Sequence, residues 1–365
     1  MALTIPSPQP TSQSPPFQLR RLPQDHYIDA LRWLPQLSAL HRHILLATFD
    51  SDTSSSSLQI LTYTPSTPNS QPPNLPLQSS YPTSSRITSL KTLLTPQSPK
   101  PLIAASTISG SLLFLTADSV NGSLDFGFSV TEKGFHRGPI SGIDASENGS
   151  LSVGEDGRIN LVRIGNGEGG SFQRVFDSNG LVSYSAVKWA SPFEFVTGGL
   201  GYSLHWWDQR RPGGPVSQFK GNWSSGATSG IVHSIDIHPS RKHTCLAGGS
   251  SGTVFAWDLR WQQQPIILSR AGTTDAYSPS ESEVWEVQYD NYTHSSNTRN
   301  FSSSRVLPAM ICSEDGILAV IEQNEVPMEL LAEPCAVNSF DIDKQNPSDV
   351  ICSLEWESIA ILTRS

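Results

Sequence analysis

Residues 246–258 read Leu-Ala-Gly-Gly-Ser-Ser-Gly-Thr-Val-Phe-Ala-Trp-Asp. The run Leu246–Gly249 is rich in small residues, a Ser-Gly turn follows it, and the apolar run Val254–Trp257 comes next. Glycine adopts a positive φ at such a turn without steric cost, so this stretch predicts a tight β-hairpin. Hairpins of the same design are expected around Ser109-Gly110, Asp156-Gly157 and Asp315-Gly316.

The hairpins recur along the chain at a regular interval. The turn glycines Gly110, Gly157, Gly201, Gly252 and Gly316 are separated by 47, 44, 51 and 64 residues. The longest interval contains a Ser-, Asn- and Thr-rich segment, which indicates an inserted loop. Helical periodicity is nearly absent. A period slightly above 40 residues with about four strands in each unit is typical of a β-propeller blade.

Seven segments have the pattern of an innermost blade strand and predict seven blades: Ile28–Leu34, Arg86–Leu93, Pro139–Ala145, Tyr184–Ala190, Ile231–His238, Glu283–Tyr289 and Ala336–Ile342. The seventh unit has room for three strands before Ser365. We expect Phe17–Leu22, ahead of the first blade, to supply its fourth strand. This closure joins the first and last blades and removes an open sheet edge. The predicted fold is all-β, a seven-bladed propeller closed by an N-terminal strand.

The propeller is expected to fill residues 15–365 as one domain, because all-β folds often exceed the usual domain length. Residues 1–14 are rich in Pro, Ser and Gln and are expected to form a disordered tail. A Pro- and Ser-rich loop at about residues 64–83 is predicted to be disordered too, unless an outer strand near Leu75–Gln78 interrupts it. Inserted loops are expected at about residues 270–281 and 291–304.

Short motifs in the predicted third strands and turns point to one repeat family. They are Trp207-Asp208, Trp257-Asp258, Asp156-Gly157 and Asp315-Gly316. Over nearly the whole chain, they resemble the WD40 repeat family. The resemblance implies a WD40-type propeller in which these eight residues are structural.

The family also has a side-chain tetrad of His, Ser or Thr, Asp and Trp within a blade. His136, Ser152 and Asp156 would supply three members in one blade, but Val162 stands where the family has Trp. The resemblance therefore supports the fold more strongly than it supports the tetrad.

The charge balance argues against nucleic-acid binding. The chain carries 33 acidic and 24 basic residues and a net charge of −9, whereas a nucleic-acid binder needs a basic surface. No stretch approaches the roughly 20 apolar residues of a membrane helix, and the N-terminal segment lacks the features of a signal peptide. We expect an intracellular chain without direct nucleic-acid binding or membrane insertion.

The sequence offers no motif for catalysis, a cofactor or a metal. The four cysteines form no C-x-x-C pair, and the histidines lack companion ligands at metal-binding spacing. The glycine-rich stretch at residues 164–170 precedes a strand-like segment, Phe172–Phe176, rather than the helix that a phosphate loop requires. Hydrolase motifs are also missing. We expect no catalytic, cofactor-binding or metal-binding residues and no small-molecule substrate, and hence a protein that is not an enzyme and binds other proteins.

Two tetrapeptides of the form W-D-x-R, at residues 207–210 and 257–260, suggest an alternative function. They resemble the box of propellers that act as substrate receptors of cullin–RING ubiquitin ligases. In that alternative, Arg210 or Arg260 would dock an adaptor protein. Ordinary strand ends, with Asp accepting turn hydrogen bonds and the arginines solvated, explain these residues too, because many WD40 proteins carry such a tetrapeptide. The ligase function is therefore the second choice.

Five further stretches together resemble a more specific family. They are residues 153–161 (Val-Gly-Glu-Asp-Gly-Arg-Ile-Asn-Leu), 284–287 (Val-Trp-Glu-Val), 312–316 (Cys-Ser-Glu-Asp-Gly), 337–341 (Val-Asn-Ser-Phe-Asp) and 360–364 (Ala-Ile-Leu-Thr-Arg). This combination resembles the WD40-repeat nucleoporins of the Y-shaped outer-ring complex of the nuclear pore. The first stretch is the most specific, because WD40 repeats in general share only its Asp-Gly.

This second resemblance implies a structural role at the nuclear envelope. The propeller would dock on α-helical scaffold nucleoporins of the outer ring and so support the transport of mRNA and protein. The chain has a single Phe-Gly pair, Phe126-Gly127, whereas barrier nucleoporins carry many. A generic cytosolic WD40 adaptor is the third hypothesis that the sequence leaves open.

Overall fold

The computed structural model describes residues 17–364 except for 36–41, 65–74, 97, 119–120, 132–133, 165–169, 202, 221–229, 261–265, 270–279, 281, 297–305 and 324. The predicted tail at residues 1–14 lies outside the described residues. So do half of the predicted loop at 64–83 and most of the predicted loops at 270–281 and 291–304 and of the glycine-rich stretch at 164–170.

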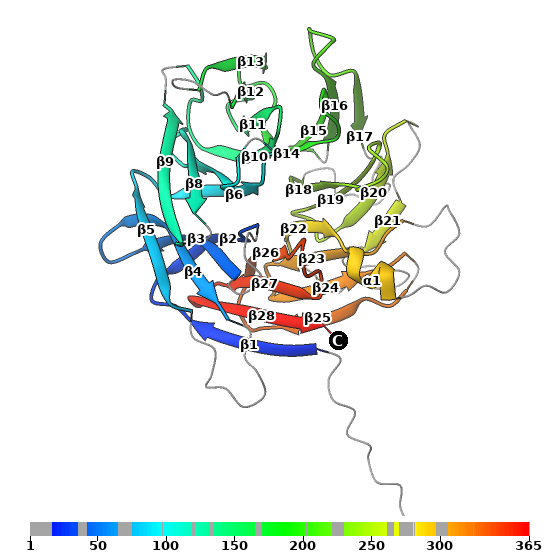
Figure 1. Ribbon diagram of the computed structural model, residues 1–365. Helices are drawn as coiled ribbons and strands as arrows, with labels where there is room; N and C mark the ends of the chain where they lie inside the picture. Colours follow the sequence, from blue (N-terminus) through cyan, green and yellow to red (C-terminus); the bar gives the residue numbers. More distant parts are fainter. Residues whose placement is uncertain are drawn as a thin grey trace, which may run out of the picture.

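The strands form seven four-stranded antiparallel sheets arranged as blades around a common centre (Figure 1). Blades 1 to 4 contain β2 (Tyr27–Trp33), β3 (Arg42–Asp50), β4 (Ser55–Tyr63) and β5 (Leu77–Thr83); β6 (Ile87–Leu93), β7 (Leu102–Thr107), β8 (Leu112–Asp118) and β9 (Ser123–Val130); β10 (Ile140–Ser146), β11 (Gly149–Gly154), β12 (Arg158–Val162) and β13 (Phe172–Asp177); and β14 (Tyr184–Trp189), β15 (Glu194–Gly199), β16 (Ser203–Asp208) and β17 (Ser217–Lys220).

Blades 5 to 7 complete the ring. They contain β18 (Val232–Ile237), β19 (Thr244–Gly249), β20 (Val254–Asp258) and β21 (Ile266–Ser269); β22 (Val284–Tyr289), β23 (Ala309–Ser313), β24 (Ile317–Ile321) and β25 (Met328–Ala332); and β26 (Val337–Ile342), β27 (Asp349–Leu354), β28 (Ser358–Arg364) and β1 (Phe17–Pro23). The predicted seven-bladed propeller is confirmed. Each innermost strand agrees with its predicted range to within one residue at either end.

The N-terminal strand closes the ring as predicted. β1 pairs antiparallel with β28, from Phe17 opposite Arg364 to Pro23 opposite Ser358, and becomes the outer strand of blade 7. The first and last parts of the chain therefore share one sheet, and β28 has no free edge.

The core lies between the blades. Seven apolar clusters are present, one at the interface of each pair of neighbouring blades. A blade in the ring is covered on both faces, so its inner strands can be apolar at successive positions. This is why β11, β12 and β15 are buried along their whole lengths.

Two outer segments lie within stretches expected to be loops. β5 occupies residues 77–83 and overlaps the outer strand considered near Leu75–Gln78; its Pro82 is tolerated because an outer strand can lack one N–H. A short helix, α1 (Asn291–Ser296), begins the stretch expected to be an inserted loop. Asp290, which accepts a hydrogen bond from the N–H of Tyr292, caps its beginning.

Candidate functional site

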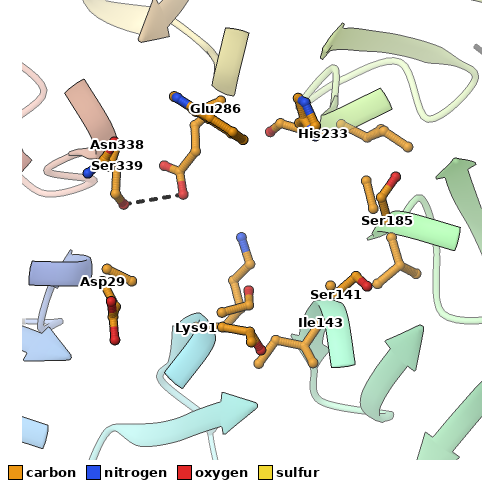
Figure 2. A pocket seen from close by; sticks show the side chains of 18 of the residues that line it. Asp29, Lys91, Ser141, Ile143, Ser185, His233, Glu286, Asn338 and Ser339 are labelled. Atoms are coloured by element: carbon orange, nitrogen blue, oxygen red, sulfur yellow. Dashed lines mark hydrogen bonds between the residues drawn. The ribbon is translucent and has the colours of Figure 1, made fainter. Parts of the chain in front are cut away.

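The ring has two faces and a central cavity. We call upper the face that carries the turns between the second and third strands, and lower the face that carries the loops between the first and second strands. The cavity has a volume of about 470 Å³ and is lined by the innermost strands and by Glu155 from an upper-face turn. Figure 2 shows that side chains from several blades point into it.

A β-bulge shapes the wall of this cavity in every blade. All seven innermost strands shift register at the same place, as between Ile28 and Ala30 in β2 and between Val337 and Ser339 in β26. A bulge leaves one residue unpaired and redirects its side chain. Consecutive residues such as Asp29 and Ala30 therefore both line the cavity.

Ionised side chains near the cavity link different blades. Arg32 Nη2 lies 2.6 Å from Glu286 Oε1 and so joins blade 1 to blade 6. Lys188 Nζ lies 3.2 Å from Asp236 Oδ1 and joins blade 4 to blade 5. Such pairing offsets part of the cost of removing these charges from water.

Lys91, on β6, extends into the cavity from the side opposite Glu286 (Figure 2). Within the described part of the chain, no carboxylate lies within ion-pair distance of its ammonium group. Burial, together with the charges of Arg32 and Lys188, lowers the pKa of Lys91 to about 8. The sequence analysis did not single out this residue.

Blade 3 contains a polar network centred on His136. Its Nδ1 lies 3.1 Å from Asp156 Oδ1, and its Nε2 lies 3.0 Å from Ser152 Oγ. Asn160, from the third strand, places its Nδ2 2.9 Å from the same Nε2. Val162, at the position where the family has Trp, is buried among apolar residues instead. The three polar residues foreseen for a tetrad thus meet, and Asn160 is the fourth member that the sequence analysis missed.

The turn of this blade depends on Asp156 and Gly157. Burial alone would raise the pKa of Asp156, but hydrogen bonds from His136 and from the backbone N–H groups of Arg137 and Arg158 outweigh it and lower the pKa to about 2. Gly157 has a φ of 73°. The corresponding turn of blade 6 places Asp315 Oδ1 2.5 Å from the hydroxyl of Ser313.

Both Trp-Asp pairs lie at the ends of third strands, with their indoles in the core. Trp207 Nε1 donates to Thr197 Oγ1 at 2.9 Å, and its ring stacks on that of Phe195. Trp257 packs edge-on against Phe219, 5.2 Å between ring centroids. Each Asp accepts from the arginine two residues later, Asp208 from Arg210 and Asp258 from Arg260.

Comparison with known proteins identifies the family. No family model matches the chain. It is 57% identical over 357 residues to the nuclear pore complex protein NUP43 of Arabidopsis thaliana, an alignment that covers 95% of this chain and 98% of that protein. The chain belongs to the Nup43 family. It is also 31% identical over 180 residues to human nucleoporin Nup43, covering 49% of this chain and 40% of the human protein. Over 185 residues it is 27% identical to nup43 of Dictyostelium discoideum, covering 50% and 37% of the two chains.

These Nup43 relatives confirm the second resemblance and give no support to the ubiquitin-ligase alternative. In this Nup43-family chain, the two arginines of that alternative lie on the lower face of neighbouring blades. Arg210 and Arg260 each form an ion pair with the Asp of their own motif, at 2.8 and 2.5 Å. The pairs hold the guanidinium groups at the surface, and the assignment of Arg210 and Arg260 as docking residues stays a prediction.

Other kinds of site are not evident in the described ranges of this family member. No three His, Cys, Asp or Glu side chains among those residues come together as a metal-binding group. The four cysteines, Cys245, Cys312, Cys335 and Cys352, are buried thiols without disulfides. No helix in the same ranges is long and apolar enough to cross a membrane.

One signal for the charged residues around the cavity was present in the sequence. Each of the seven predicted innermost strands has an apolar residue followed by a polar one at the same position. The polar residues are Arg32, Lys91, Asp144, Lys188, Asp236, Gln288 and Asp341. An alignment of the seven strands would have revealed this ring, whereas a search for motifs did not.

Proposed function

We propose that this chain is a structural scaffold component of the outer ring of the nuclear pore complex. The observation that carries the proposal is 57% identity across almost the full length of a protein named as a nuclear pore complex protein. A closed ring with a core between all its blades is rigid, and it offers two faces and a rim to partners. In this role, the chain supports nucleocytoplasmic transport of mRNA and protein by contact rather than by catalysis.

The partners that fit this role are other nucleoporins, in particular α-helical scaffold subunits of the outer ring. The role needs no cofactor, no small-molecule substrate, no membrane insertion and no direct contact with nucleic acid. The net charge of −9 supports the last point, because a phosphate backbone would be repelled by most of the surface. The WD-repeat residues would then stabilise the fold rather than contact a partner. They are Asp156, Gly157, Trp207, Asp208, Trp257, Asp258, Asp315 and Gly316.

Affinity purification of the tagged full-length chain from nuclear extract, with quantitative mass spectrometry, tests the proposal. We expect outer-ring subunits in near-equal amounts to the chain, and rim staining of the nucleus by the fluorescently tagged chain. Recovery of a cullin adaptor without nucleoporins, lost in Arg210→Ala or Arg260→Ala, would instead favour the ligase alternative. Recovery of neither class would leave a generic adaptor and reject both.

A further inference from the structure

The lower-face loops of blades 4 and 5 carry five cations and one exposed aromatic ring. They are Phe193, Arg210 and Arg211 from blade 4, and Arg241, Lys242 and Arg260 from blade 5. We call these six residues the basic patch. An ion pair links the two blades within it, because Lys242 Nζ of blade 5 lies 2.6 Å from Glu194 Oε2 of blade 4. Within blade 4, Arg210 lies over the Phe193 ring at 5.5 Å.

Charge is layered within this patch, with cations outside and anions beneath. The side chains of Arg210, Arg260 and Lys242 are 59%, 58% and 46% exposed. The carboxylates of Glu194 and Asp208 are 11% and 10% exposed, and Asp258, the partner of Arg260, is 34% exposed. Each carboxylate is thus less exposed than the cation it pairs with, so a partner that approaches the patch meets the cations first, although each of those three cations is already paired.

Phe193 adds an apolar anchor to the charged surface. It is 52% exposed at the tip of the loop between β14 and β15. An aromatic ring beside arginines is the composition found at the centres of protein interfaces. The upper face differs in charge, since its turns display exposed Glu155, Glu314, Glu355 and Glu357.

We infer that the basic patch docks an acidic, extended or helical segment of a partner protein of the pore complex. Carboxylates of the segment would pair with the outer guanidinium and ammonium groups, and an apolar side chain would cover Phe193. Arginine presents a planar fork that matches a carboxylate. A protein segment fits better than RNA, because a long phosphate backbone leaving this small patch would run over an acidic surface. The inference rests on the proposed function, since that function supplies the partner.

The first test uses purified full-length chain and fluorescent peptides of alternating Glu and Leu, with a matched peptide of Gln and Leu and a single-stranded RNA oligonucleotide. We expect the Glu peptide alone to bind, with an affinity that falls as salt is added. The double variant Phe193→Ala, Arg211→Glu should weaken this binding about tenfold. Both residues are exposed, and circular dichroism checks that the variant folds.

A matched control lies on the opposite face. The double variant Leu181→Ala, Arg137→Glu also removes one exposed apolar residue and reverses one exposed arginine. It should bind the Glu peptide as the unmodified chain does. The inference is overturned if the patch variant binds the Glu peptide as tightly as the unmodified chain does, or if the control variant loses as much binding as the patch variant. Binding of the RNA without binding of the Glu peptide would overturn it as well.

The second test compares the three proteins as baits in nuclear extract. We expect the patch variant to lose at least one nucleoporin that the unmodified chain and the upper-face control retain. If all three retain the same nucleoporins, the inference fails and the proposed function stands. If the unmodified chain retains no nucleoporin, the proposed function fails, and the peptide measurement alone then decides whether the patch binds acidic segments.

Discussion

Three carboxylates, one buried and two partly buried, each connect one blade to the next. Each accepts a hydrogen bond from the backbone N–H of an innermost strand in the following blade, at 2.8 to 2.9 Å. The pairs are Asp144 with Trp189, Asp236 with Tyr289 and Asp341 with Trp33. A charged acceptor makes such a bond stronger than a neutral one. The ring is thus held by directional contacts as well as by its apolar interfaces.

Asp156→Asn should destabilise the protein in a way that depends on pH. The pKa of this carboxyl is lowered on folding to about 2, so its contribution is fully present above the pKa of the unfolded chain and is lost as pH falls toward 2. Urea unfolding should show the variant about 2 kcal/mol less stable at pH 7, with a smaller difference at pH 3. A difference that does not change with pH would contradict this account.

Lys91→Met should stabilise the protein at neutral pH. The pKa of Lys91 is lowered on folding to about 8, so the unfolded chain binds the proton more tightly, and stability rises as pH increases from about 8 toward the normal lysine value. We expect the variant to gain about 1–2 kcal/mol in free energy of unfolding at pH 7. The gain should vanish near the normal pKa of lysine. A loss of stability at pH 7 would show that Lys91 has a compensating partner.

The positions of the strands are set mainly by the turns between them and by the neighbouring blades that cover their faces. The turns between second and third strands were predictable because Asp-Gly and Ser-Gly pairs have a local conformational reason to lie there. The innermost strands were predictable to within a residue because each repeats one spacing of buried apolar and less buried residues, as in β6, β18 and β22. The outer strand β5 was predictable only in part, as the possible strand near Leu75–Gln78, since an edge strand needs little apolar sequence and tolerates Pro82.

Gly157→Ala should cost far more stability than Gly201→Ala. Both glycines have positive φ, 73° and 74°, so both variants incur a backbone cost of about 1 kcal/mol. A Cβ at residue 157 would lie 1.8 Å from Ser178 Oγ, whereas at residue 201 it meets nothing within 4 Å. We expect about 2 kcal/mol or more of additional destabilisation for residue 157, measured by urea unfolding. Equal losses would mean that the blade 3 turn can relax.

The whole molecule depends on how its two chain ends meet in blade 7. β1 supplies the outer strand, and two arginines fix the blade to its neighbours. Arg364 forms a buried pair with Asp290 of blade 6 at 2.6 Å, and Arg42 of blade 1 pairs with Asp343 and Asp349 of blade 7. Blade 7 is therefore tied to both sides, so we expect the ring to unfold as one unit.

A chain that begins at Gln24 should be less stable and prone to associate. It lacks β1, so it exposes the edge of β28 and loses the contacts of Phe17 and Leu19, a loss on the order of 3 kcal/mol. Thermal unfolding should show a lower midpoint, and size-exclusion chromatography should show oligomers. A chain that begins at Phe17 is the control and should match the full-length protein. Identical behaviour of the two shortened chains would mean that β1 does not close the ring.

The sequence by itself determined the blades, their number and the family. Repeats of strand, glycine turn and strand are local, and each has a physical cause within a few residues of the chain. Only the tertiary structure decided which side chains meet across blades. It brought Asn160 to His136, Arg32 to Glu286, and Lys242 to Glu194, pairs that lie on different strands or blades. Curvature and register of the closed ring set those distances. For that reason the basic patch emerged only from the structure, although its two W-D-x-R motifs were visible in the sequence.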